Sequence, residues 1–307
     1  MIDNGETGNV EPLAGILPFT LLRPVSPAPP ASNVGFGAAV NLAIGSTEAP
    51  YIAALNDDAE PGAAWLENLV RAADSDESVG MCASCIELSG QDRLDSAGML
   101  ICLDGSSRQR GHQAPVSAFP VSEEVLCPSA CAALYRRAML DEVGVFDEDF
   151  FLYCEDTDLG LRARWAGWRC VYVPRAVVVH RYSGTAGTSS ALKARYVERN
   201  RLWVAIKNFP LPLLLLVPVA SLARYAWQVV AIRRNKGLAA AFMQSGYTFP
   251  DAVAIVLRAH WETLLEMPRL LRKRAAGARR RKVAPAEFGR LLRRHAMSLR
   301  DLALAGA

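Results

Sequence analysis

The chain has 307 residues, of which 51% are hydrophobic and 21% are charged. This composition is that of a globular protein and excludes a chain that is disordered throughout. The seven cysteines are an odd number, which favours reduced thiols in the cytoplasm over a disulfide framework. Cys82 and Cys85 have the spacing of a redox or zinc pair, but no second CxxC or His pair accompanies them. We interpret both as small buried side chains.

The net charge of +3 conceals two regions of opposite sign. Residues 1–200 carry 15 Lys and Arg against 26 Asp and Glu, whereas residues 201–307 carry 19 against 5. An acidic body is more typical of a metal-centred site than of a nucleic-acid surface. A basic tail favours anionic lipid or an acidic partner, and its arginines are not interleaved with aromatic residues, which argues against nucleic acid.

The first half of the chain alternates short apolar runs with amphipathic segments, which predicts an α/β fold. Residues 19–22 are expected to form a short strand, 37–44 a helix, 51–55 a buried parallel strand and 79–88 a further strand. Pro61 is expected to open a helix that contains Trp65 and Val70, because proline suits the first helical turn.

The spacing of apolar residues becomes helical after Asp158, and Gly167 is expected to end that helix. Two strands are predicted at 170–173 and 177–179, separated by Pro174, and His180 follows the second. Residues 191–207 are predicted to form a basic amphipathic helix.

Polar residues recur where the carboxyl ends of parallel strands would lie, and ligands bind there in open α/β sheets. Asn56, Asp57 and Asp58 follow the strand at 51–55; a turn is the alternative interpretation. His180 ends a later strand and is open to interpretation as a hydrogen-bonded core histidine. The glycine-rich segment 33–41 leads into a helix, where a backbone can approach an anion closely.

The stretch 150–158, "FFLYCEDTD", sets carboxylates directly behind an apolar run. Burying an unpaired charge is costly, so these acids are expected to face a partner. Glu155 and Asp156 also stand where they could simply cap the helix that follows.

The order of these features resembles that of an inverting family-2 glycosyltransferase with a GT-A fold, close to the rhamnosyltransferase-like branch. The resemblance is carried by "NVGFGAAVNLAIG" (33–45), "YIAALNDDAEP" (51–61), "LYRRAMLDEVGVFDEDFFLYCEDTDLGLRARWAGWRCVYVPRAVVVHR" (134–181) and "ERNRLW" (198–203). It implies a Rossmann-like, mostly parallel sheet flanked by helices. The implied activity is transfer of a sugar from a nucleotide-diphospho-sugar, a dTDP- or UDP-sugar, to a hydroxyl of a glycan or lipid-linked acceptor with inversion.

The resemblance also implies roles for single residues. Asp58 and His180 would hold Mn²⁺ or Mg²⁺, Asp156 would be the general base, and Glu155 is the second choice for that role. The residues implied to bind substrate are Asp3, Asn33, Gly35, Asn41, Asn56 and Asp57. These types fit the chemistry, because transfer with inversion needs a base for the acceptor hydroxyl and positive charge at the departing diphosphate.

The chain departs from the family pattern in two places. It begins at Met1-Ile2-Asp3-Asn4, where members of the family normally have a preceding strand and helix, so the N-terminal strand is expected to be missing and the true start to lie upstream. Ala130-Cys131 stands where a Gly-Ala pair is common, which is expected to tighten the acceptor side.

We expect a transferase domain at 1–208 and a helical, basic region at 209–307. The apolar run 209–223 is too short for a spanning helix and contains Pro210, Pro212 and Pro218, so an interfacial or re-entrant segment is favoured over a true span. The basic run 269–282 is expected to contact anionic lipid, with a solvated helical tail as the alternative.

The expected location is therefore cytoplasmic and peripheral, at the inner face of the cell membrane, in keeping with an acceptor for cell-envelope polysaccharide. Two other function classes stay open: a non-catalytic sugar-nucleotide-binding or scaffold protein derived from this fold, and a basic tether joined to a vestigial body.

Overall fold

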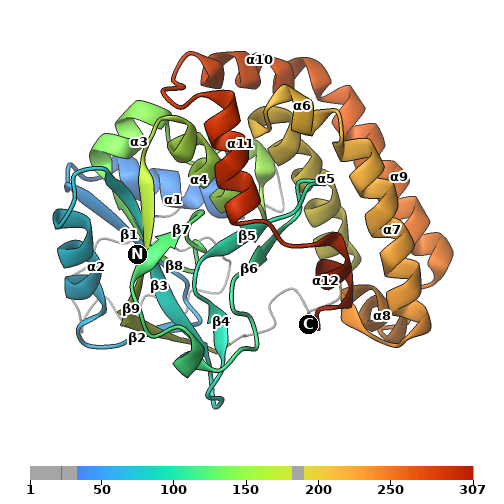
Figure 1. Ribbon diagram of the computed structural model, residues 1–307, viewed down its shortest axis with the longest axis horizontal. Coiled ribbons are helices and arrows are strands. Elements are labelled where there is room, and N and C mark those ends of the chain that lie inside the picture. The colour runs from blue at the N-terminus through green and yellow to red at the C-terminus, as the bar shows by residue number, and fades with distance from the viewer. Residues whose placement is uncertain (1–21, 23–32, 182–189, 307) are drawn as a thin grey trace.

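A central sheet flanked by helices forms the body of the protein in the computed structural model, which describes residues 22, 33–181 and 190–306 (Figure 1). The order of paired strands is β1-β8-β3-β9-β2, with β4 added to β3 and β7 added to β9. The strands are β1 (Tyr51–Leu55), β2 (Ala59–Pro61), β3 (Val79–Leu88), β4 (Leu94–Ser96), β7 (Glu123–Val125), β8 (Ala132–Arg136) and β9 (Arg169–His180). A separate two-stranded sheet consists of β5 (Met99–Ile101) and β6 (Ser107–Gln109).

The α/β fold class is confirmed, but the expectation of a mostly parallel sheet is wrong for the described strands. Only β3 and β9 pair in parallel, and the other pairs in this sheet are antiparallel. β1 pairs antiparallel with β8, and its burial alternates along the strand, so it is not the fully buried parallel strand that we expected. An apolar run gives the period of a strand but not the direction of its neighbours.

Local structure follows the apolar pattern closely, with two exceptions. The helices α1 (Phe36–Gly45), α4 (Glu155–Trp165) and α5 (Ala191–Asn208) lie where they were predicted. Pro61 instead ends β2, and α2 (Trp65–Asp74) begins four residues later. The two strands predicted around Pro174 are one strand, β9, whose pairing with β3 jumps from Val173 to Val177; proline is tolerated in a strand at such a bulge. The predicted strand 19–22 lies outside the described residues except for Leu22.

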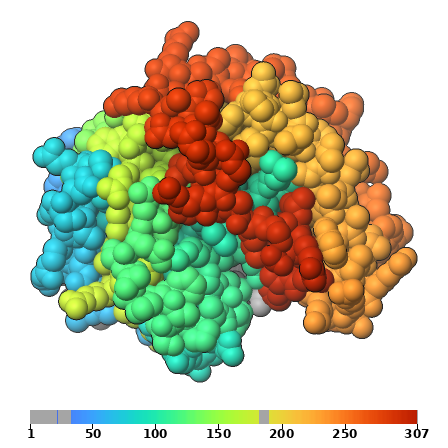
Figure 2. Space-filling view, viewed as in Figure 1, coloured from blue at the N-terminus to red at the C-terminus, as the bar shows by residue number. Residues whose placement is uncertain are grey.

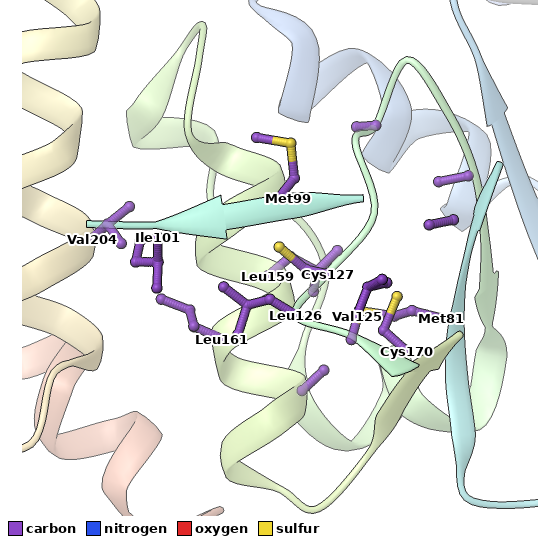
Figure 3. Packing of buried hydrophobic residues seen from close by; sticks show 14 of the residues in the cluster. Met81, Met99, Ile101, Val125, Leu126, Cys127, Leu159, Leu161, Cys170 and Val204 are labelled. Atoms are coloured by element: carbon purple, nitrogen blue, oxygen red, sulfur yellow. The ribbon is translucent and has the colours of Figure 1, made fainter. Parts of the chain in front are cut away.

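Buried side chains pack on both faces of the sheet. The larger cluster joins the sheet to α4 and α5; Figure 3 shows Ile101 beside Val204 and Leu126 beside Leu161. The smaller cluster lies under α2 and includes Leu69. Cys85 belongs to the first cluster and Cys82 to the second. The two thiols therefore face opposite sides of β3, and burial raises the pKa of Cys82 to about 12. Both behave as small core residues.

The described helices after residue 208 pack directly against this body, as the gold-to-red atoms in Figure 2 show. Phe209, Val217, Leu270 and Phe288 belong to the larger core cluster, and the Phe288 ring stacks on Trp165 with centroids 3.8 Å apart. Among the described residues, none of the helices combines the length and apolarity needed to cross a bilayer. The remaining helices are α3 (Arg137–Val143), α6 (Leu211–Leu214), α7 (Val217–Arg233), α8 (Gly237–Gln244), α9 (Phe249–Leu265), α10 (Met267–Ala278), α11 (Pro285–Arg294) and α12 (Leu299–Leu304).

Candidate active site

The loop before α4 has an unusual backbone. Phe151, Tyr153 and Cys154 all have positive φ, of 64°, 69° and 69°, a region that side chains other than glycine rarely adopt. Such strain persists only where the surroundings enforce it, and it clusters at functional sites. The loop leads straight into Glu155 and Asp156 at the first turn of α4, so it sets the position of both carboxylates.

Asn200 of α5 holds this loop in place. Its side-chain amide donates to the carbonyl oxygens of Phe150, Leu152 and Tyr153 at 3.0, 2.7 and 2.8 Å. Arg199 adds hydrogen bonds to the carbonyl oxygens of Asp149 and Phe150. The motif "ERNRLW" therefore serves the candidate site by fixing the backbone that presents the acids.

The glycine-rich segment packs against the same loop. The Phe36 amide donates to the Phe151 carbonyl oxygen at 2.9 Å. A Cβ on Gly35, whose φ is +88°, would lie only 2.5 Å from that oxygen. The Asn33 side chain accepts a hydrogen bond from the Gly35 amide, and the Asn41 amide bonds to Phe146 and Glu148. Gly35 and Asn41 thus contact the segment before α4, and their expected contact with substrate stays a prediction.

Asp156 and Glu155 are consecutive but differ in environment. Asp156 accepts hydrogen bonds from the Ala130 amide at 3.3 Å and the Thr157 amide at 2.6 Å; burial raises its pKa, and these bonds act in the opposite direction. Glu155 is buried and its Oε2 atom has no hydrogen-bond partner. Burial and the adjacent Asp156 carboxylate raise the pKa of Glu155 to about 8. Burial thus raises the pKa of both carboxyl groups, and of the two only Asp156 accepts hydrogen bonds from neighbouring amides that favour its charged form.

The third acid of the stretch points elsewhere. Asp158 is fully buried, and its carboxylate bonds to Arg162 at 2.9 Å, to Lys207 at 2.8 Å and to Asn208 at 2.8 Å. Burial alone would raise its pKa, but Lys207 and Arg162 outweigh burial and lower it. Asp158 therefore joins α4 to α5 as part of an ion-pair network.

Asp58 and His180 are brought together by strand register. Ala59 of β2 pairs with His180 of β9, and this places the His180 Nε2 atom 3.1 Å from Asp58 Oδ1. The Nδ1 atom of the same ring lies 2.9 Å from Asp95 Oδ2. Hydrogen bonding to Asp95, and then to Cys131, raises the pKa of His180 to about 10. A carboxylate behind a histidine in this way is the usual arrangement for a metal-binding imidazole.

Sequence patterns gave no indication of Asp95. It lies in the short strand β4, and only the pairing of β4 with β3 brings it to His180. Its carboxylate also accepts from the His112 ring, at 3.2 Å. Burial would raise the pKa of Asp95, but the hydrogen bonds from the two histidines outweigh burial and lower it.

The pair of Asp58 and His180 fits a divalent cation that is shared with a substrate. The 3.1 Å between the two groups is that of a direct hydrogen bond. Two ligands about 2.1 Å from one octahedral ion also lie about 3 Å apart, so the pair could hold an ion with little movement once the imidazole has lost its proton. In the described part of the chain no group of three His, Cys, Asp or Glu side chains surrounds one metal position. An ion held here would therefore complete its coordination with water or phosphate oxygens, as Mg²⁺ commonly does.

A single peptide unit connects the base candidate to the metal pair. The Ala130 amide donates to Asp156, and the next residue, Cys131, interacts through its side chain with His180. The Cys131 carbonyl oxygen accepts a hydrogen bond from the backbone N–H of Asn56 at 2.8 Å. Asp57 is exposed in the adjoining turn, whereas Asp3 lies outside the described residues.

Lys193 is a further residue that sequence reasoning missed. It lies in the first turn of α5, with Nζ 5.6 Å from the centre of the Tyr153 ring. Burial and the neighbouring Arg108 lower the pKa of Lys193, while Asp95 acts in the opposite direction. The described residues contain no ion pair to Lys193. Lys193, Arg108 and Asp95 are therefore close enough to influence one another.

Comparison with known proteins agrees with this geometry. Residues 11–205 match the model of "Glycosyltransferase like family 2". An N-acetylglucosaminyl-diphospho-decaprenol L-rhamnosyltransferase of Mycobacterium tuberculosis (strain ATCC 25618 / H37Rv) is 30% identical over 221 residues, covering 62% of this chain and 68% of that protein. A pre-mycofactocin glycosyltransferase of the same organism is 27% identical over 244 residues, covering 76% of this chain and 51% of that protein.

Among solved structures, GalNAc-T7 with UDP, GalNAc and Mn²⁺ superposes with a TM-score of 0.50 at 14% identity. The match covers 66% of this chain and 40% of the GalNAc-T7 chain. This likeness concerns the fold and confirms the GT-A architecture. With the family match over most of the body, the chain belongs to glycosyltransferase family 2.

Proposed function

We propose that the chain transfers a sugar from a nucleotide-diphospho-sugar to a hydroxyl of a glycan or lipid-linked acceptor, with inversion at the anomeric carbon. The observation that supports this proposal is that two consecutive residues contact both groups: the Ala130 amide donates to Asp156, and the Cys131 side chain interacts with His180, which lies 3.1 Å from Asp58. Inversion by direct displacement needs a base on the acceptor side and charge neutralisation on the opposite, leaving-group side.

Asp156 would accept the proton of the acceptor hydroxyl as that oxygen attacks the donor. Its two amide hydrogen bonds keep the carboxylate in place and favour its charged form. Glu155, whose pKa is about 8, would be protonated near neutral pH and so is the weaker candidate for the base.

Asp58 and His180 would hold Mn²⁺ or Mg²⁺, which neutralises the negative charge of the departing diphosphate when bound. Asp95 would keep the His180 ring oriented. Lys193 and Arg108 would add positive charge on the same side. Asn56 and Asp57 are proposed to contact the sugar or the ribose of a dTDP- or UDP-sugar.

The relative that transfers rhamnose acts, by its name, on a diphospho-decaprenol acceptor. By analogy we propose a lipid-linked acceptor for this chain and a peripheral position at the inner face of the cell membrane. We also propose that the transferase fold itself ends near residue 208, although the helices that follow share its core and would not fold as a separate unit.

The first experiment is thermal unfolding with UDP, dTDP or GDP, each with and without Mn²⁺. A ligand bound only by the native state at 100 times its Kd stabilises that state by about 2.7 kcal/mol. We expect a metal-dependent rise in Tm with one nucleotide, lost in Asp58→Ala.

The second experiment separates catalysis from binding. Asp156→Asn should lower kcat by at least about 100-fold while donor still raises Tm. No Tm shift with any nucleotide would contradict a donor site. Full activity in Asp156→Asn would remove Asp156 as the base. A Tm shift without turnover of any acceptor would instead favour a non-catalytic sugar-nucleotide-binding protein.

A further inference from the structure

Two neighbouring helices of the C-terminal region carry matching apolar strips. α7 and α9 lie side by side and run in opposite directions (Figure 1), with the Tyr225 and His260 rings 6.4 Å apart. Leu215, Val219 and Leu222 follow one another at spacings of four and three residues, and so do Leu257, Trp261 and Leu264. Leu257, Trp261 and Leu264 therefore form one strip along α9. Val219 and Leu222 form a strip along α7, which Leu215 extends from the turn just before that helix.

These strips face solvent. The six side chains are each between 60% and 70% exposed. Ala220 and Arg224 of α7, and Ala259 and Thr263 of α9, are buried on the opposite faces. Tyr225 of α7 and His260 of α9 mark the sides on which the two helices face each other. Looking along each helix from its N-terminus, the apolar strip is rotated away from that side in the same direction in both helices. Because the helices are antiparallel, the two strips lie on the same side and form one surface, which we call the α7–α9 face.

Basic residues stand at both ends of the α7–α9 face. Arg233 ends α7 at one end, and Arg234 and Lys236 follow it; Arg269 and Arg272 begin α10 at the other, and all five are exposed. Arg269 also pairs with Asp149 and Glu266. The acid nearest the middle, Glu262, is bonded to Arg195 and Arg258. The face thus combines an apolar centre with cationic ends.

We propose that the α7–α9 face docks the protein in the plane of a lipid surface that contains anionic headgroups. Helices with one apolar side and cationic flanks lie in the interface between headgroups and acyl chains. A tryptophan such as Trp261 suits that depth because its ring is amphipathic. The cations at the two ends match the negative charge of the lipid. The α7–α9 face would thus be the surface that contacts the lipid, which a peripheral membrane location alone does not specify.

The position of the face has a consequence for the acceptor. α9 packs on α5, with Arg195 and Glu262 joined at 2.6 Å. α5 carries Lys193 at its first turn and Asn200 against the loop before α4. A lipid surface on the α7–α9 face would therefore lie about one helix diameter, roughly 10 Å, from α5. The headgroup of a lipid-linked acceptor could then reach the site while its chain stays in the lipid; this step alone rests on the proposed function.

The test is co-sedimentation of the full chain with vesicles of phosphatidylcholine, with and without phosphatidylglycerol. We expect binding to the anionic vesicles that weakens as salt rises. The double substitution Leu222→Glu and Trp261→Glu should weaken that binding by at least about tenfold, because both charges would enter the interface. The matched control is Leu66→Glu with Val121→Glu, which changes two exposed apolar residues elsewhere and should leave binding intact.

Circular dichroism and thermal unfolding are used to check that each variant is folded. Vesicle binding by the α7–α9 double variant equal to that of the control variant would overturn the proposal. Analytical ultracentrifugation tests the other occupant of the face, a second copy of the chain. A wild-type dimer that does not bind vesicles, and that becomes a monomer only in the α7–α9 double variant, would also overturn the proposal. Vesicle binding needs no sugar donor, whereas glycosyl transfer is measured on a soluble acceptor. Loss of one can therefore be told apart from loss of the other.

Discussion

Glu155 and Asp156 show how adjacent carboxylates acquire different properties. Asp156 receives two amide hydrogen bonds, whereas the Glu155 Oε2 atom is buried without a hydrogen-bond partner. Two acids whose environments push their pKa values apart commonly divide the roles at an active site. Here burial raises the pKa of both groups, and the hydrogen bonds that oppose it for Asp156 make Asp156 the better candidate for the charged group.

Glu155→Gln should change stability in a pH-dependent way. The pKa of Glu155 is about 8 in the folded chain and about 4.3 when unfolded, so between these values the folded state binds the extra proton. The contribution of Glu155 to the free energy of unfolding therefore falls as pH rises from about 4 to about 8, by up to about 1.4 kcal/mol per unit. Glutamine does not titrate, so the free energy of unfolding of the variant should rise relative to that of the wild type as pH increases across this window.

Urea denaturation at pH 5, 6.5 and 8 measures this gain. Glu67→Gln, at an exposed helix position, is the matched control and should show little change in the difference. A constant difference between Glu155→Gln and wild type over the three pH values would contradict the assignment.

Gly35→Ala tests the contact between the glycine-rich segment and the loop before α4. The added methyl would lie 2.5 Å from the Phe151 carbonyl oxygen at a φ of +88°, so we expect a loss of about 1–3 kcal/mol in unfolding free energy. Gly45→Ala is the matched control at the other end of α1, where nothing lies within 4 Å. It should be neutral or stabilising. Chemical denaturation compares the two, and equal effects would remove this role from Gly35.

At the scale of elements, α5 determines where the loop before α4 lies. Asn200→Ala would remove the side-chain donor to the carbonyl oxygens of Leu152 and Tyr153, whereas the Phe150 carbonyl oxygen would keep Arg199. We expect a loss of about 2–5 kcal/mol, together with a kcat at least about tenfold lower because the carboxylates shift.

Asn68→Ala is a suitable control, since Asn68 donates to the Arg175 carbonyl oxygen at an exposed position and should cost less than about 1 kcal/mol. Denaturation and turnover with a soluble acceptor measure both variants. An unchanged kcat in Asn200→Ala would show that the loop holds its conformation without this residue.

Element type could be predicted from the sequence far better than strand direction. The spacing of apolar residues located α1, α4, α5 and β3 because side-chain periodicity reflects local backbone geometry. Pro174 suggested a break between two strands, yet the partner strand β3 continues past it. Direction and bulges depend on neighbours far along the chain, which no local pattern reveals.

Some residues of the candidate site could likewise be predicted from the sequence, and others could not. Asp58, His180, Asp156 and Glu155 stand at element ends and could be proposed from the sequence. Asp95 and Lys193 could not, because β4 and the start of α5 meet the site only through tertiary packing. Glycine-rich and amide residues in 33–41 looked like ligand contacts, whereas the contacts seen for Gly35 and Asn41 hold the chain itself.

At the scale of the molecule, a buried cluster of charges joins the body to the C-terminal helices. Arg201 of α5 is fully buried and donates to Ser221 at 2.9 Å and Tyr225 at 2.7 Å. Glu198 bonds to both Arg201 and Arg224, and these partners lower its pKa against the effect of burial. A buried charge that loses its partner costs about 3–5 kcal/mol.

A chain that ends at Asn208 should therefore fail to fold cooperatively. It would lose Arg224, Ser221 and Tyr225, and with them core residues such as Phe288. We expect weak near-ultraviolet circular dichroism and binding of a hydrophobic dye, as in a molten globule. A sharp unfolding transition of this fragment, with nucleotide still raising its Tm, would instead show that the body is an independent domain.

The consecutive placement of Ala130 and Cys131 has a consequence for the order of events. A ligand that binds His180 would compete with its interaction with Cys131, the residue that follows the one whose amide donates to Asp156. Linkage requires any such influence to be mutual: if donor tightens acceptor by some factor, acceptor tightens donor by the same factor. A donor bound at His180 would thus also bear on Asp156, and the two substrates are expected to bind with coupled rather than independent affinities.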